Sequence, residues 1–199
     1  MQSDIIHVTN DGVGIEQALE QAERVAAFKS LSHKDALHLR LLAEEMMGML
    51  RGLTGEREAD FWIDDAADTF RLHLKAQTLM NAELRKKLLS ASTSGQNSAV
   101  KGVMGKIRDL FNRLLEPADS DFLGSIAAGM TYDAATVGDM SMMSVNIWSL
   151  NQYRAAVQKE TDAQEVWDEL EKSVVARLAG EVEIGIADRT VEMVIYKKF

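Results

Sequence analysis

The sequence contains no cysteine and a single proline among its 199 residues. Without cysteine, the chain can form neither a disulfide framework nor a thiolate metal site. It also lacks any stretch near the roughly 18 consecutive apolar residues that a membrane-spanning helix requires. The first residues, M-Q-S-D-I-I-H-V-T, have neither the basic start nor the apolar run of a signal peptide. We therefore expect a cytoplasmic protein with no membrane span.

Positive charge is also scarce, because 22 lysines and arginines face 31 acidic residues and leave a formal net charge of −9. Such a chain is poorly suited to nucleic acids, whose binding requires a basic surface that displaces counterions. A nucleotide is not excluded, since backbone amides can hold its phosphates. The four histidines do not have the spacing of metal ligands, so we expect no metal site.

The longest regular pattern runs from Ser32 to Leu53 and predicts a helix. Ser32 can cap its first turn, with Asp35 three residues later. Two acids interrupt its most apolar part: Glu44 falls on the polar face, whereas Glu45 falls at the edge of the apolar stripe. Glu45 is therefore either a boundary residue with a packed stem or a functional acid. The apolar positions recur at three- and four-residue steps: Leu39, Leu42, Met46, Met49, Leu50 and Leu53.

The remaining patterns predict an α+β protein. Segment 69–76 alternates most clearly, and it forms with segment 59–64 a predicted hairpin that has one wet face, on which Arg71, His73 and Lys75 lie. Helices separated from antiparallel hairpins are typical of a two-layer sandwich, here a mostly antiparallel sheet covered on one face by helices. The other expected elements are a strand at 5–9, helices at 14–28, 81–89, 99–115 and 163–179, and a hairpin of 181–186 with 191–196.

We interpret residues 1–199 as a single domain that contains an unusual excursion at 116–161. Its part from 116 to 150 is rich in glycine, alanine, methionine and serine and has no sustained period. Loops of this length are uncommon and are usually functional or disordered. Methionine packs adaptably, so a lid, a partner surface and an excursion packed on the core all remain open.

The loop S-A-S-T-S-G-Q-N-S at 90–98 leads into a helix that begins A-V-K-G-V-M-G-K. Its two early glycines, Gly102 and Gly105, would each cost roughly 1 kcal/mol in a helix interior. They cost less in the first turn of a helix whose backbone must come close to a ligand or to another part of the chain. Tolerance of glycine for close helix packing is an equally acceptable explanation.

The order of elements and several local sequences resemble the Bergerat-fold ATPases, which include histidine-kinase ATPase domains, and most closely the anti-sigma serine kinases. In that family one helix carries a glutamate that activates the attacking hydroxyl or water, and an asparagine four residues later coordinates magnesium on ATP. In L-A-E-E-M-M-G-M-L, Glu45 matches the glutamate. The asparagine position is Met49, or Gly48 if the register slips by one, and neither ligates magnesium. The resemblance thus implies ATP as the cofactor and no magnesium on the family's usual ligand.

The resemblance also assigns residues to the ATP phosphates. Four would lie in a lid, Ser92, Thr93, Ser94 and Gly95, and four in the glycine motif, Lys101, Gly102, Gly105 and Lys106. Whether helix 99–115 or helix 163–179 fills the glycine-motif role stays open. Segment 72–81 lacks the family's adenine-binding aspartate. N-D-G-V-G-I at 10–15 resembles that glycine box but precedes the Glu45 helix, so we interpret it as a turn.

Two functions remain open. The first is a regulatory protein that binds ATP or ADP as the anti-sigma kinases do, with Glu45 as base. The second is a non-catalytic relative that keeps the scaffold as a protein-interaction module, with 116–150 as its partner surface. Both imply a protein partner, and a homodimer is compatible with either.

Overall fold

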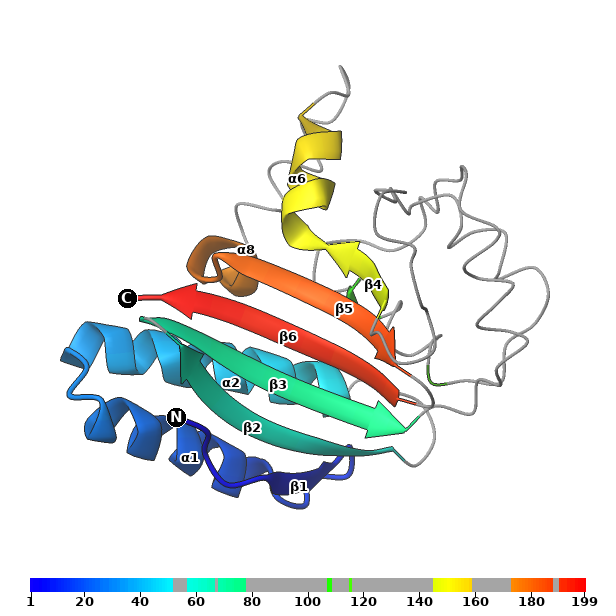
Figure 1. The fold of residues 1–199 in the computed structure, drawn as a ribbon. Helices are drawn as coiled ribbons and strands as arrows, with labels where there is room; N and C mark the ends of the chain where they lie inside the picture. The colour runs from blue at the N-terminus through cyan, green and yellow to red at the C-terminus, as the bar shows by residue number, and fades with distance from the viewer. Residues whose placement is uncertain are drawn as a thin grey trace.

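A computed structural model describes residues 1–51, 57–66, 68–77, 107–108, 115, 145–158, 173–187 and 190–199 (Figure 1). Six antiparallel strands form one sheet, and helices pack against one of its faces, which confirms the predicted α+β sandwich. The elements in chain order are β1 (Ile6–Thr9), α1 (Ile15–Phe28), α2 (His33–Arg51), β2 (Glu58–Ala66), β3 (Thr69–Gln77), β4 (Val145–Ser149), α6 (Leu150–Val157), α8 (Val174–Leu178), β5 (Glu181–Ala187) and β6 (Thr190–Lys198).

The sheet has the strand order β1-β2-β3-β6-β5-β4. The two predicted hairpins, β2–β3 and β5–β6, are present and pair with each other through β3 and β6. At the centre of this junction His73 of β3 lies opposite Val194 of β6 and Trp62 of β2. The β2–β3 hairpin and the sequence-distant strand β6 therefore meet around His73.

Helices α1 and α2 form an antiparallel pair because only a short link joins them. Ser32 caps α2 as predicted: the Asp35 amide donates to Ser32 Oγ at 3.2 Å, and Ser32 Oγ donates to the Asp35 carboxylate at 2.7 Å. In Figure 1, α2 passes behind β3 and β6. The two helices thus cover one face of the sheet with their apolar sides.

The core lies between this helix pair and the sheet. Residues alternate along β2 and β3, so that every second side chain is buried against the helices. Burying one leucine- or phenylalanine-sized side chain stabilises the fold by about 1.5–3 kcal/mol. Among the largest fully buried side chains are Phe61, Ile63, Leu72 and Leu74 from the sheet and Leu39, Leu42, Met46, Met47 and Leu50 from α2.

Strand β4 and helix α6 were not predicted. They lie at 145–157, within the stretch interpreted as an excursion. Strand β4 forms one edge of the sheet by pairing with β5, with a shift of register between Asn146 and Trp148. Of the predicted helix 163–179, the structure describes α8 and its flanking residues. The predicted helix 81–89 lies outside the described residues. Of helix 99–115 only residues 107, 108 and 115 are described, and Ile107 and Leu115 are fully buried in the core.

Candidate functional site

Of the predicted site residues, the structure describes Glu45. The lid and glycine-motif residues lie outside the described part of the chain, so their role at the ATP phosphates stays a prediction. They are Ser92, Thr93, Ser94, Gly95, Lys101, Gly102, Gly105 and Lys106. The candidate site is therefore built from α2 and its surroundings.

Glu45 lies on the side of α2 that faces away from α1. Arg40 marks the α1-facing side, because its guanidinium bonds the Glu23 carboxylate of α1. Glu45 follows Arg40 by five residues, which places it about 140° further round the helix. Helix α8 contacts α2 as well, so α2 is packed between two helices beneath the sheet.

The environment of Glu45 disfavours its charged form. The side chain is partly buried, and burial raises the pKa of its carboxyl group, with a smaller contribution from the negative charge of Glu44. Within the described residues, no hydrogen bond or ion pair involves the Glu45 carboxylate. A partly desolvated acid of this kind is more often a functional group than a fully solvated one.

The next turn of α2 carries no oxygen ligand for a cation. Met49 is 3% exposed and belongs to the core. Gly48 is exposed, and a Cβ atom added there would meet nothing within 4 Å. The described residues also contain no cluster of three or more histidine or acidic side chains that could hold a metal ion. Met49 and Gly48, which the resemblance matches to an asparagine, thus do not fit magnesium.

The N-D-G-V-G-I segment is a turn that joins β1 to α1, as predicted. Asn10 fixes it to the start of β2: the Asn10 amide donates to the Arg57 carbonyl, and the Arg57 amide donates to Asn10 Oδ1, both at 3.0 Å. Gly12 and Gly14 have φ angles of 114° and 75°, which other residues rarely adopt. The glycines therefore shape the turn.

The sequence did not predict a polar cluster centred on His73. Its imidazole stacks on the indole of Trp62 with ring centroids 4.6 Å apart and planes 7° apart. Nδ1 lies 2.7 Å from Glu192 Oε1, and Nε2 lies 3.0 Å from Asp64 Oδ2, although the second contact falls outside hydrogen-bond geometry. Alternation along β3 correctly predicted which face His73 occupies. The prediction that His73 is exposed to solvent on this face is wrong, because only 9% of the residue is exposed.

Comparisons with known proteins add no family to this description. No protein-family profile, no curated protein and no solved structure matches the chain. Among the described residues, no helix is both long enough and apolar enough to cross a membrane.

Proposed function

We propose that this chain is a regulatory protein on a histidine-kinase-like ATPase scaffold and that it binds ATP or ADP beside α2. The observation that carries the proposal is Glu45, a partly buried acid with a raised pKa and no described partner. The α+β sandwich and the lid-like sequence at 90–98 are in keeping with it. Members of the Bergerat class use a glutamate at the matching position of the corresponding helix.

In this proposal Glu45 accepts a proton. A bound ATP would supply the phosphoryl group, and the protein would supply the base. A carboxylate whose pKa is raised is a stronger proton acceptor than a solvated one, which suits a general base for a serine hydroxyl or a water. Lys101 and Lys106 would attract the phosphates, and the amides near Gly102 and Gly105 would hold them.

Calorimetric titration with ATP and ADP, with and without magnesium, tests the proposal. We expect micromolar binding to the wild-type chain and a loss of at least about tenfold in Gly105→Trp, since the bulky ring would occupy the phosphate site. Phe28→Trp is a matched control, because Phe28 is 71% exposed on α1. No heat at millimolar nucleotide, or equal losses in both variants, would reject nucleotide binding.

A second candidate function is a protein-interaction module that binds no nucleotide. The observation that favours it is the burial of Met49 beside the side-chain-free Gly48, which leaves α2 without a magnesium ligand. Its test is a pull-down of cellular partners with the full chain and with a chain that lacks residues 116–144. The deletion should end there because β4 begins at Val145. Retention of every partner after the deletion would reject this surface.

A further inference from the structure

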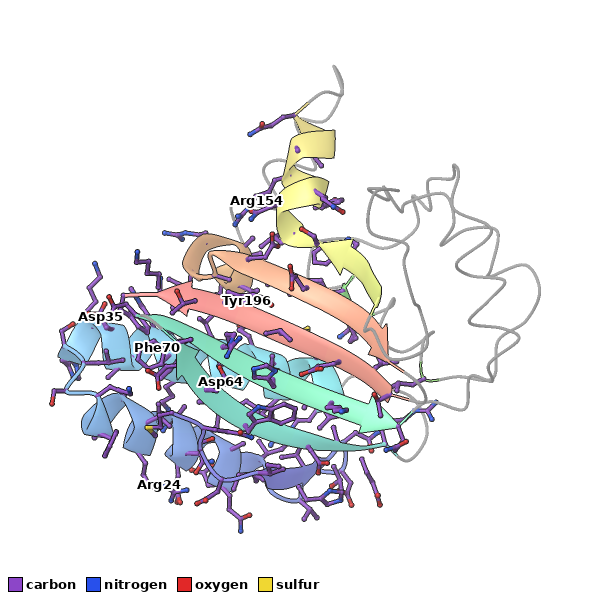
Figure 2. All side chains as sticks on the ribbon, viewed as in Figure 1. Arg24, Asp35, Asp64, Phe70, Arg154 and Tyr196 are labelled. Atoms are coloured by element: carbon purple, nitrogen blue, oxygen red, sulfur yellow. The ribbon has the colours of Figure 1, made fainter. Side chains whose placement is uncertain are left out.

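The sheet has one face that no described helix covers. Helices α1, α2 and α8 pack on the opposite face, and in Figure 1 no described helix lies in front of β2, β3 and β6. The side chains that alternate with the buried core positions point to this open face. Asp64 and Tyr196, labelled in Figure 2, belong to it.

The open face is acidic. Its carboxylates outnumber its lysines and arginines by six to three, which is an excess of three negative charges. The acids are Glu58, Asp60, Asp64, Glu181, Glu183 and Glu192, and the bases are Arg71, Lys75 and Lys198. The surplus on this face has the same sign as the net charge of the whole chain.

Some acids of the open face already form partly buried hydrogen bonds with neighbouring side chains, and others do not. The Asp64 carboxylate accepts a hydrogen bond from Arg71 Nε at 2.5 Å, and the Glu192 carboxylate is hydrogen-bonded to His73 Nδ1. The side chains of Glu58 and Asp60 are 74% and 53% exposed, and among the described residues the exposed imidazole of His7 is the one ion-pair contact of each, at 3.8 and 3.3 Å. Lys75 stands opposite Asp60 in the pairing of β2 with β3 but forms no described ion pair with it. These two carboxylates can therefore pair with cations from outside.

Glu58, Asp60 and Trp62 form a row along β2. They occupy alternate positions of one strand, so consecutive side chains of the row stand about 6.6–6.8 Å apart. Trp62 is held flat against His73, and His73 is fixed in turn by carboxylates on two neighbouring strands. The row thus combines two available carboxylates with one rigid aromatic ring.

We propose that this row binds an extended, arginine-rich segment of a partner protein. An extended segment repeats its side chains at the same spacing as β2. Guanidinium groups pair with carboxylates in a fork geometry and also stack on tryptophan, which an ammonium group does less well. The negative charge of the face repels nucleic-acid phosphates and a second copy of the same face. This partner surface lies on the other side of the sheet from α2 and does not depend on nucleotide binding.

The test uses a fluorescein-labelled peptide, Arg-Ser-Arg-Ser-Arg-Ser-Arg, and its lysine counterpart, titrated with the full chain and followed by anisotropy. We expect the arginine peptide to bind more tightly, and its binding to weaken at high salt. The double variant Glu58→Gln with Asp60→Asn should weaken binding by at least about tenfold. Trp62→Leu should remove most of the preference for arginine over lysine.

A charge-matched control separates this row from the general acidity of the chain. Glu16→Gln with Glu20→Gln removes the same number of charges from the exposed side of α1 and should change affinity by less than about twofold. Urea unfolding verifies that each variant is folded. Equal weakening in the two double variants, no preference for arginine, or no binding to the wild-type chain would overturn the proposal.

Discussion

The α-carbon of Gly14 lies so close to the carbonyl oxygen of His7 that a Cβ atom added to it would be 2.0 Å from that oxygen. Gly14 also caps the N-terminus of α1 with a φ of 75°. Close approach and left-handed backbone thus coincide at one residue. The close approach of the start of α1 to β1 therefore accounts for a glycine at this position, and no bound ligand is needed to explain it.

Gly14→Ala should therefore destabilise the protein strongly. The substitution adds backbone strain and a clash with a carbonyl group that cannot move easily, and we expect a loss of at least about 2 kcal/mol in the free energy of unfolding. Urea denaturation measures it. Gly12→Ala is the control, because Gly12 also has a positive φ but has nothing within 4 Å. If the two losses were equal, the His7 contact would contribute nothing.

Glu45→Gln should stabilise the protein at neutral pH. The folded-state pKa of Glu45 is raised above its unfolded value, so ionisation opposes folding and stability falls as pH rises through this range. Because the side chain is only partly buried, we expect a gain below about 1 kcal/mol at pH 7. The gain should vanish below about pH 4, where the carboxyl is protonated in both states. Urea titrations at both pH values measure it, and a gain that is independent of pH would contradict the account.

Asp65→Asn should show the opposite pH dependence. A hydrogen bond from Lys29 Nζ, at 2.6 Å, lowers the pKa of Asp65, so the ionised carboxylate stabilises the folded state above its unfolded pKa. The variant should lose up to about 1 kcal/mol at pH 7, the upper range for such pairs. The loss should shrink as pH falls below about 4. Urea unfolding of Asp65→Asn, of Lys29→Met and of the double variant checks it, and additive losses would exclude coupling between the two residues.

Gly48→Asn should make ATP binding depend on magnesium, provided that nucleotide binds beside α2. The position is exposed and has open space for a side chain, and an amide oxygen there is a hard ligand. Magnesium should then strengthen ATP binding to this variant by about tenfold and leave the wild type unchanged. Calorimetry measures it, with Gly48→Ala as the control. An equal response of the two variants to magnesium would argue against a site on this turn.

Local patterns in the sequence predicted most of the described elements. The Ser32 cap and the apolar steps up to Leu50 located α2, and alternation located β2 and β3, because each signal lies within one element. The pairing of β3 with β6 could not be predicted in this way. It joins residues such as His73 and Val194, which are far apart in the chain, and no local signal encodes it.

The candidate site was predictable only in part. Glu45 could be singled out because an acid at the edge of an apolar stripe is unusual, and burial does raise its pKa. The cluster of Trp62, His73 and Glu192 escaped prediction, since its members come from three strands. Strand β4 escaped because it is short and follows a stretch without a period.

The most direct test of the central claim is amide NMR of the full chain during titration with ADP. If nucleotide binds beside α2, the amide signals of Glu45 and Gly48 should shift strongly and saturably. Those of Trp62 and His73, on the other side of the sheet, should move little. An absence of shifts at millimolar ADP, or shifts confined to the open face, would contradict nucleotide binding at α2.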